Sequence, residues 1–305
     1  MRTAFSDALV AAAIADPRVV LLTGDHGYAL FDSFRKARPD QYINCGIAEQ
    51  NMVGVAAGLA KAGFKPIVYG LAAFVPIRVL EQIKIDICYE NLPVILIGDG
   101  AGLVYSHLGT SHQSTEDIAC TRAIPELTLL SPADRFEMTA TMELALRLNS
   151  PVYMRVGKSD RGDVHSAPLD LEVGQMIQVK TGQARIAILA TGSMVSTGIE
   201  LAESGIDAQV WSVPSIKPLN LDQLAQIVAQ IDCLITIEEH SIMGGLGALI
   251  AEETSAIRPV PICRIGIKDR FSHYCGSWDY LLQEHQLDIS SVKNTVGEFL
   301  KKILT

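Results

Sequence analysis

Short apolar stretches of strand length alternate with helical patterns along most of this chain, and this alternation restricts its fold more than any other feature. The stretches 18–27, 65–70 and 92–102 each carry such a run, and residues 47–63 and 74–90 between them repeat apolar residues at helical spacing. Strands buried on both faces of a parallel sheet appear in a sequence as continuous apolar runs joined by helical crossovers. The pattern therefore predicts an α/β fold with parallel sheets.

The alternation lapses once, which indicates two domains. Residues 161–183 are polar and rich in glycine, and a second alternating series begins with "RIAILATGS" at residue 185. A length of 305 residues is about twice the common domain size. We predict one parallel-sheet α/β domain over 1–160, a linker over 161–183 and a second such domain over 184–305. Helices are expected at 195–204, 221–230 and 244–255.

Composition and charge exclude several classes of protein. The net charge of −9 argues against a nucleic-acid-binding surface, and we expect no nucleic-acid partner. No apolar run approaches the roughly 20 residues that span a membrane, and Asp7 and Asp16 do not fit a signal peptide. The six cysteines lack the spacing of metal ligands, so we expect reduced thiols, no metal site on this chain and a cytoplasmic location.

Three loops follow predicted strands of the first domain, where open α/β sheets bind their ligands. They span residues 23–31, 69–74 and 98–117, and the last is long and contains two histidines and four glycines. Loops of that length between packed elements are usually functional. In addition, Glu49 stands at the start of an apolar helical stretch, where a carboxylate is costly to bury without a partner.

Several common site motifs are missing. The chain has no GxGxxG after its first strand, no GxxxxGK[ST] and no GxSxG, so neither a dinucleotide site, a P-loop nor an α/β-hydrolase nucleophile is indicated. In the second domain "TIEEHS" (236–241) ends a strand with polar residues. His240 belongs either to a solvated loop or to an interface or active-site edge, and the sequence leaves both open.

Taken together, particular stretches resemble the C-terminal half of transketolases. The first domain carries "INCGIAEQNM" (43–52), "GTSHQSTED" (109–117) and "SPAD" (131–134), and the second "AILATGS" (187–193) and "TIEEHSIMGGLGALIAE" (236–252). The resemblance covers nearly the whole chain and implies a pyrimidine-binding domain followed by a transketolase C-terminal domain. The "GDG" at 98–100 lacks the downstream asparagines of the family's Mg²⁺ and diphosphate motif. The chain therefore resembles the smaller subunit of a split transketolase.

The resemblance implies a transferase that moves a two-carbon ketol unit between sugars, usually phosphorylated, with thiamine diphosphate. Glu49 matches the glutamate that hydrogen-bonds N1′ of the cofactor's aminopyrimidine, and His112 is the second catalytic candidate. Phe74 matches the aromatic residue that stacks on the aminopyrimidine, and Ile77 lies in a neighbouring pocket position. Asp25 corresponds to an aspartate near the cofactor.

The same resemblance implies which residues bind the substrate. Leu108 stands where relatives carry an aspartate that reads a sugar hydroxyl, so stereochemical preference is not carried over. Lys158 replaces the usual arginine at a phosphate-binding position; it keeps the charge but loses the bidentate fork, and Arg161 is an alternative. The substrate-binding candidates are His26, His107, His112, Arg2 and Lys158.

A partner chain is implied as well. In this family the diphosphate and Mg²⁺ are held by an N-terminal domain, so we expect an N-terminal transketolase chain as partner in an α₂β₂ assembly. Alternatives are an enzyme like 1-deoxyxylulose-5-phosphate synthase, the β-type subunit of a 2-oxoacid dehydrogenase, and a non-catalytic scaffold subunit. The loop at 109–117 favours the first two enzymes over the dehydrogenase, and the synthases are normally single chains. The presence of Glu49, Phe74 and His112 argues against a scaffold.

Overall fold

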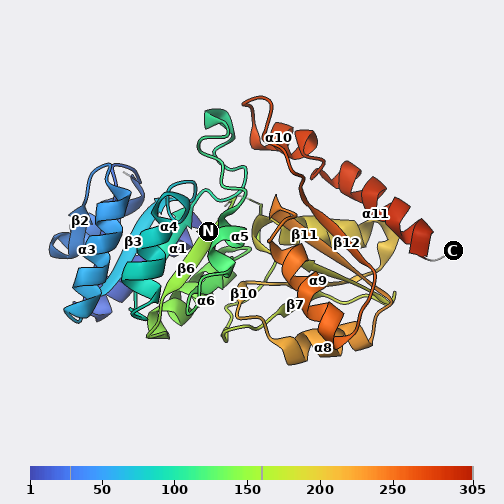
Figure 1. Cartoon of the computed structure of the whole chain (residues 1–305), viewed down its shortest axis with the longest axis horizontal. Helices are drawn as coiled ribbons and strands as arrows, with labels where there is room; N and C mark the ends of the chain where they lie inside the picture. The colour runs from blue at the N-terminus through green and yellow to red at the C-terminus, as the bar shows by residue number, and fades with distance from the viewer. Residues whose placement is uncertain (28, 159–160, 304–305) are drawn as a thin grey trace.

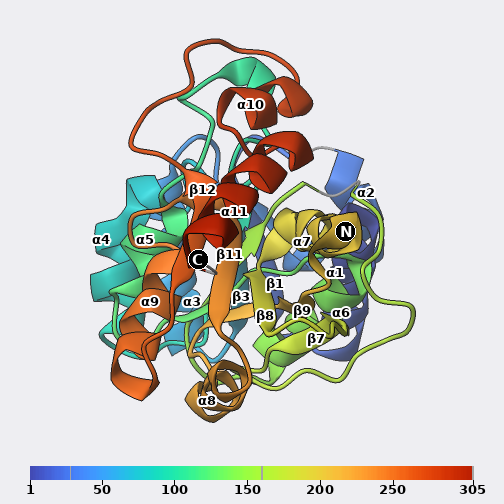
Figure 2. The same cartoon turned by 90° about the vertical axis from the view of Figure 1, so that its right-hand side faces the viewer.

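Two mostly parallel sheets, each covered by helices, form the molecule. The computed structural model describes residues 1–27, 29–158 and 161–303, and the two sheets lie next to each other along the long axis in Figure 1. Figure 2 looks from the side of the second sheet, with the first domain behind it. The expected α/β class with two successive domains is confirmed. The boundary predicted at residue 160 itself lies outside the described residues.

The first sheet has seven strands in the order β10-β5-β6-β4-β3-β1-β2, and all neighbours are parallel except β10 with β5. The elements of the first domain are α1 (Arg2–Ala15), β1 (Val19–Thr23), α2 (Asp32–Ala37), β2 (Tyr42–Asn44), α3 (Glu49–Lys61), β3 (Lys65–Leu71), α4 (Leu80–Gln82), β4 (Ile95–Asp99), α5 (Asp117–Arg122), β5 (Thr128–Leu130), α6 (Arg135–Arg147) and β6 (Val152–Val156).

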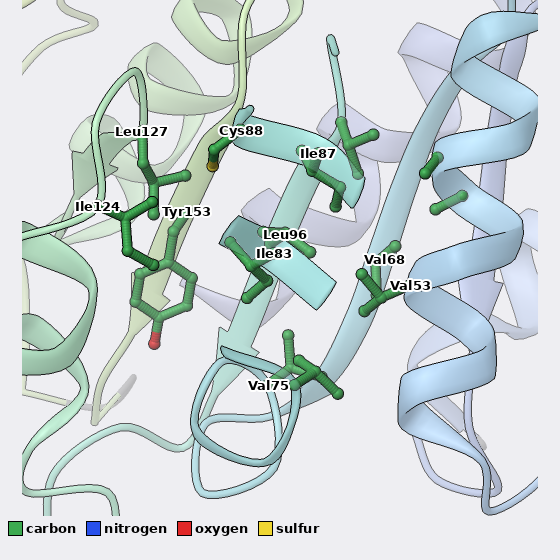
Figure 3. Close-up of a cluster of buried hydrophobic side chains, with 14 of the residues drawn as sticks. Val53, Val68, Val75, Ile83, Ile87, Cys88, Leu96, Ile124, Leu127 and Tyr153 are labelled. Carbon is green, nitrogen blue, oxygen red and sulfur yellow. The ribbon is translucent and has the colours of Figure 1, made fainter. Parts of the chain in front are cut away.

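Two apolar layers fix the helices on this sheet. On one face α1 and α6 pack on strand residues such as Leu21 and Ile97. On the other, α3 and the segment 83–88 pack on alternate residues of the same strands, and Figure 3 shows Val53 of α3 facing Val68 of β3. Burial of both faces explains why these strands are continuously apolar.

The three predicted site loops start at one edge of this sheet. They follow β1, β3 and β4, which are parallel neighbours with Thr23 opposite Tyr69 and Leu71 opposite Asp99. Carboxyl ends of parallel strands meet at a common edge, so the loops at 23–31, 69–74 and 98–117 begin side by side.

The second sheet has five strands in the order β12-β11-β8-β9-β7, and only β7 runs antiparallel to its neighbour. Helices α8 and α9 cover one face, while α7 and α11 cover the other. The elements are β7 (Ile177–Lys180), β8 (Ile186–Ala190), α7 (Val195–Leu201), β9 (Gln209–Ser212), β10 (Ser215–Lys217), α8 (Leu221–Ala229), β11 (Cys233–Ser241), α9 (Leu246–Ile257), β12 (Ile262–Ile267), α10 (Trp278–Glu284) and α11 (Ile289–Ile303).

Two strands cross the expected domain limits. β7 lies within 161–183, the segment expected to be a linker, and forms an edge of the second sheet. β10 comes from the second half of the chain but pairs with β5, so it extends the first sheet. The chain therefore returns to the first sheet before the second is complete.

Some helical predictions differ from the structure in detail. The segment expected to be one helix over 74–90 consists of a 3₁₀ turn at Ile77–Val79, the short α4 and a π-helical segment at Ile83–Cys88. α7 ends at Leu201, where a second π-helical segment begins. In the described part of the chain no helix combines the length and the apolar character that crossing a membrane requires.

Candidate active site

Glu49 begins helix α3 and is almost completely buried. Only 5% of the residue is exposed, although it follows an apolar stretch and precedes another. The amide dipoles at a helix start favour a negative charge there. Its Oε2 also accepts a hydrogen bond of 3.0 Å from Nη1 of Arg78, which follows β3. The carboxylate is thus compensated from two sides.

An aromatic residue and a histidine lie against this pair. The guanidinium carbon of Arg78 lies 4.1 Å from the centroid of the Phe74 ring. The imidazole of His112 meets the same ring edge-on at 5.4 Å between centroids. We call Glu49, Phe74, Arg78 and His112 the Glu49 cluster. It brings together loops after β3 and β4 with the start of α3.

Other residues predicted for the cofactor lie near this cluster. His26 is partly buried, with Nε2 at 3.2 Å from the backbone oxygen of Tyr69, and burial lowers the pKa of its imidazole. Asp25 is exposed in the loop after β1. Ile77 is partly buried at the start of the 3₁₀ turn that carries Arg78.

A second group of residues lines a cavity of about 500 Å³. His107, Lys158 and Arg161 contribute from the first half of the chain, and Trp278 from α10. The Lys158 ammonium lies 5.8 Å and the Arg161 guanidinium 5.1 Å from the Trp278 ring, within the range of cation–π attraction. Asp279 lines the cavity as well. We call His107, Lys158, Arg161 and Trp278 the cation pocket.

Arg2 belongs to neither group. Its Nη2 lies 2.9 Å from Oδ2 of Asp99 at the end of β4, and the negative charge of Asp99 raises the pKa of the guanidinium. Tyr105 donates to the same carboxylate oxygen at 2.8 Å. Arg2 is not among the residues that line the cation pocket. Its charge is engaged by a buried carboxylate.

A buried ion pair joins the two domains. Nε of Arg155 in β6 lies 3.0 and 2.9 Å from the two oxygens of Asp117, and both side chains are at most 2% exposed. Tyr153, whose hydroxyl is visible in Figure 3, donates to Asp117 at 2.7 Å. Nη2 of Arg155 donates at 2.6 Å to the backbone oxygen of Glu239 in β11 of the second sheet.

Glu239 closes this interdomain contact through fixed donors. Its carboxylate accepts hydrogen bonds from the Leu103 amide at 2.6 Å, from Trp278 Nε1 at 3.0 Å and from Ser193 Oγ at 2.8 Å. Gly102 precedes the contact with φ of 73°, and a Cβ there would lie 2.6 Å from Oε1 of Glu239. Only glycine fits so close an approach at positive φ.

The neighbours of Glu239 on β11 are equally buried. Glu238 accepts from the amides of Leu246 and Gly247 at the start of α9, while burial raises the pKa of its carboxyl to about 7. Burial lowers the pKa of His240 to about 4. The neutral ring donates from Nδ1 to Ser241 and accepts at Nε2 from the Ala119 amide of the first domain. His240 therefore lies in the interface between the domains, one of the two possibilities that the sequence left open.

The structure thus divides the predicted residues into groups. Glu49, Phe74 and His112 meet in one cluster, His107 and Lys158 meet in the cation pocket, and Arg2 lies apart from that pocket. Sequence reasoning missed Arg78 and Trp278. Arg78 follows Phe74 by four residues, and its amide donates to the Phe74 oxygen at 3.1 Å, so one turn carries both. That spacing is the only signal in the sequence for Arg78, and Trp278 has none.

Comparisons with known proteins agree with this geometry. Residues 1–162 match the family model described as transketolase, pyrimidine binding domain, and residues 175–292 match transketolase, C-terminal domain. One of the two subunits of the apulose-4-phosphate transketolase of Phocaeicola vulgatus is 35% identical over 99% of this chain and 97% of that protein. A solved structure described as split gene transketolase, inactive β4 tetramer, superposes with a TM-score of 0.88 at 34% identity, covering 98% of this chain and 97% of that one.

A longer relative shows the same two domains as part of a larger protein. 1-deoxy-D-xylulose-5-phosphate synthase of Chlorobium luteolum is 34% identical over 97% of this chain, which spans 48% of that enzyme. The two family models together cover most of the sequence, in the order in which the structure places the two sheets. The chain belongs to the transketolase family and consists of its pyrimidine-binding domain followed by its C-terminal domain.

Proposed function

We propose that this chain is the smaller subunit of a split transketolase, which moves a two-carbon ketol unit between sugars together with a partner chain. The observation that carries the proposal is the Glu49 cluster, a nearly buried carboxylate beside an aromatic ring, in a chain that matches almost the full length of an apulose-4-phosphate transketolase subunit. The solved relative described as an inactive β4 tetramer supports the need for a second kind of chain.

The cluster fits the aminopyrimidine of thiamine diphosphate. That ring is flat and carries a ring nitrogen that shares a proton with a carboxyl group, so it needs an acidic oxygen and an aromatic or apolar face. Glu49 supplies the first, Phe74 the second, and Ile77 adds an apolar wall. When bound, thiamine diphosphate supplies an electron sink for breaking the carbon–carbon bond next to a carbonyl. Glu49 holds the shared proton at the ring nitrogen, and its burial keeps water from competing for it.

The histidines beside the cluster suit a polyhydroxylated substrate. His112 touches the Phe74 ring and is only partly buried, so its imidazole can exchange hydrogen bonds with sugar hydroxyls next to the cofactor. His26 and Asp25 extend the polar rim from the loop after β1. Leu108, which is 54% exposed, offers no hydrogen bond at its position. We therefore propose a hydroxyl selectivity different from relatives with an aspartate there.

The cation pocket suits the anionic end of a phosphorylated sugar. Lys158 and Arg161 bring two positive charges to one cavity, and His107 adds a ring that can donate hydrogen bonds. Loop 98–117 contributes His107 to this cavity and His112 to the Glu49 cluster, so one segment connects the two groups. Arg2, whose charge is paired with Asp99, is a weaker candidate for binding phosphate.

The partner would hold the diphosphate and Mg²⁺, in an assembly of two copies of each chain in the cytoplasm. Exposed apolar side chains on the first domain support an interface: Ile47 is 81% and Tyr89 85% exposed. Val55 of α3 and Ile85 are also exposed, and α3 packs against the segment 83–88. All six cysteines, each a described residue, are free thiols, as suits a reducing compartment.

Purification of the tagged chain from its native extract tests this function. We expect a second chain in equal amount, carrying the GDG motif and its downstream asparagine pair, together with thiamine diphosphate in the eluate. A chain that purifies without partner and without cofactor would contradict the proposal and favour a scaffold.

The purified complex then separates the enzyme classes by their donors. A transketolase consumes a ketose phosphate in the presence of an aldose acceptor. Turnover of pyruvate with an aldehyde would instead identify a synthase of the kind matched over half its length. Turnover of a branched 2-oxoacid would identify a dehydrogenase subunit.

A further inference from the structure

Arg78 makes, within this chain, the two contacts that the proposed function assigns to the aminopyrimidine. Nη1 donates to Oε2 of Glu49 at 3.0 Å, and the guanidinium lies over the Phe74 ring with Cζ 4.1 Å from its centroid. A guanidinium is flat and delocalised, donates from its edge and stacks through its face. In these respects it resembles an aminopyrimidine ring more closely than any other side chain does.

We propose that Arg78 is a placeholder in the cofactor site, which occupies the position of the aminopyrimidine in the free subunit and must swing away before the cofactor binds. The inference rests on the proposed function, since it takes Glu49 and Phe74 as ligands of that ring. It adds a residue that competes with the cofactor for both of them.

The exposure of the two partners supports a movable role for Arg78. Its side chain is 42% exposed, whereas that of Glu49 is 6% exposed. A long side chain with one face in solvent can leave without repacking the core, while the carboxylate remains fixed at the start of α3. The segment that carries Arg78 is a 3₁₀ turn, not the middle of a long helix.

The placeholder also serves the free subunit. A nearly buried carboxylate without a partner destabilises a fold, and Arg78 provides that partner while no cofactor is bound. Removal of Arg78 therefore has effects of opposite sign: the free subunit loses stability, and the assembled enzyme binds its cofactor more tightly. A residue with a merely structural role would not produce the second effect.

The test measures thiamine diphosphate binding by calorimetry, with Mg²⁺ present, to the cofactor-free complex of this chain and its partner. Arg78→Met should tighten the apparent Kd roughly 3- to 30-fold, because the cofactor no longer displaces an ion pair and a cation–π contact. Arg78→Lys keeps the charge but loses the flat face and should fall between the two. Arg18→Met is the matched control, since Arg18 is also an ion-paired arginine of the first domain but lies at the opposite end of β1.

Thermal unfolding of the free subunit gives the second readout. Arg78→Met should lower the melting temperature by about 2 °C, and the addition of Glu49→Gln should restore part of it because no buried charge then lacks a partner. If the wild-type complex binds the cofactor and Arg78→Met binds it equally or more weakly, the placeholder is overturned while the proposed function stands. If neither complex binds it, the proposed function fails and the placeholder fails with it.

Discussion

Glu49 in the first domain and Glu239 in the second are both buried carboxylates that follow apolar stretches, but their surroundings differ. Glu239 accepts from a backbone amide, an indole and a hydroxyl, all held by the fold. Glu49 is paired with a side chain that is itself half exposed. A carboxylate surrounded by fixed donors stabilises a structure, whereas one with a movable partner can exchange that partner for a ligand. Burial alone does not separate the two cases; the mobility of the donors does.

The largest effect that would test this comparison is on turnover. Glu49→Gln removes the proton that the carboxyl group shares with the cofactor, and general acid–base contributions of this kind are worth roughly 10²- to 10⁴-fold in rate. We expect kcat of the assembled enzyme to fall by that amount, while the melting temperature of the free subunit changes little. A variant that keeps its turnover would show that Glu49 is as structural as Glu239.

The interdomain side of the comparison is tested by Arg155→Met. It leaves Asp117 buried beside Tyr153 without its cation, and breaking a buried pair by removing one member costs about 3–5 kcal/mol. Urea unfolding of the free subunit should show this loss. The double variant with Asp117→Asn should recover part of the stability, since it removes the unpaired charge. A loss under about 1 kcal/mol for the single variant would mean that water enters the interface.

The pH dependence of stability sharpens the comparison. The pKa of His240 is lowered from 6.5 to about 4, so between those values the unfolded chain binds the extra proton. Its contribution is fully present above about pH 6.5 and is lost as the pH falls toward 4, by up to about 3 kcal/mol.

Glu238, 3.7 Å from His240, acts in the opposite direction: its contribution is present below pH 4.5 and is lost as the pH rises through about 7. Melting curves of His240→Gln and Glu238→Gln from pH 4 to 8 should separate the two slopes. Variants with the slope of the wild type would contradict these assignments.

The smallest effect concerns an ion pair on the surface between the domains. Arg122 of α5 holds both oxygens of Glu252 in α9, but the Glu252 side chain is 57% exposed. Glu252→Gln should cost less than about 1 kcal/mol and less still at high salt, because solvent and ions screen exposed pairs. Unfolding at two salt concentrations measures this, and a cost near that of Arg155→Met would show that exposure does not decide the strength of these interdomain contacts.

The sequence predicted the sheets better than their edges. Strands such as β3 and β4 are buried on both faces and therefore stand out as apolar runs. β2 and β10 have three residues each, too few for a period, and β10 belongs to the first sheet only because the folded chain brings it to β5. Beyond residue 267 the alternation gives no prediction, and α10 and α11 occupy that region.

The candidate site was predictable where it follows a motif. Glu49, Phe74 and His112 were chosen from the sequence and lie in one cluster, although their roles stay predictions. Arg78 and Trp278 were not chosen, because each gains its importance from residues far away in the chain. Trp278 is 120 positions after Lys158 and reaches the cation pocket only once α10 packs above loop 98–117.

The antiparallel pairing of β10 with β5 limits how this polypeptide can be divided. A cut between residues 162 and 175, where the two family models meet, would leave β5 as an open sheet edge and strip β10 of its pairing strand. The halves cannot be exchanged as independent modules, because a seven-stranded sheet must be completed by a segment synthesised after the second domain has begun. During translation the first domain therefore waits for its last strand, and the two domains mature as one cooperative unit.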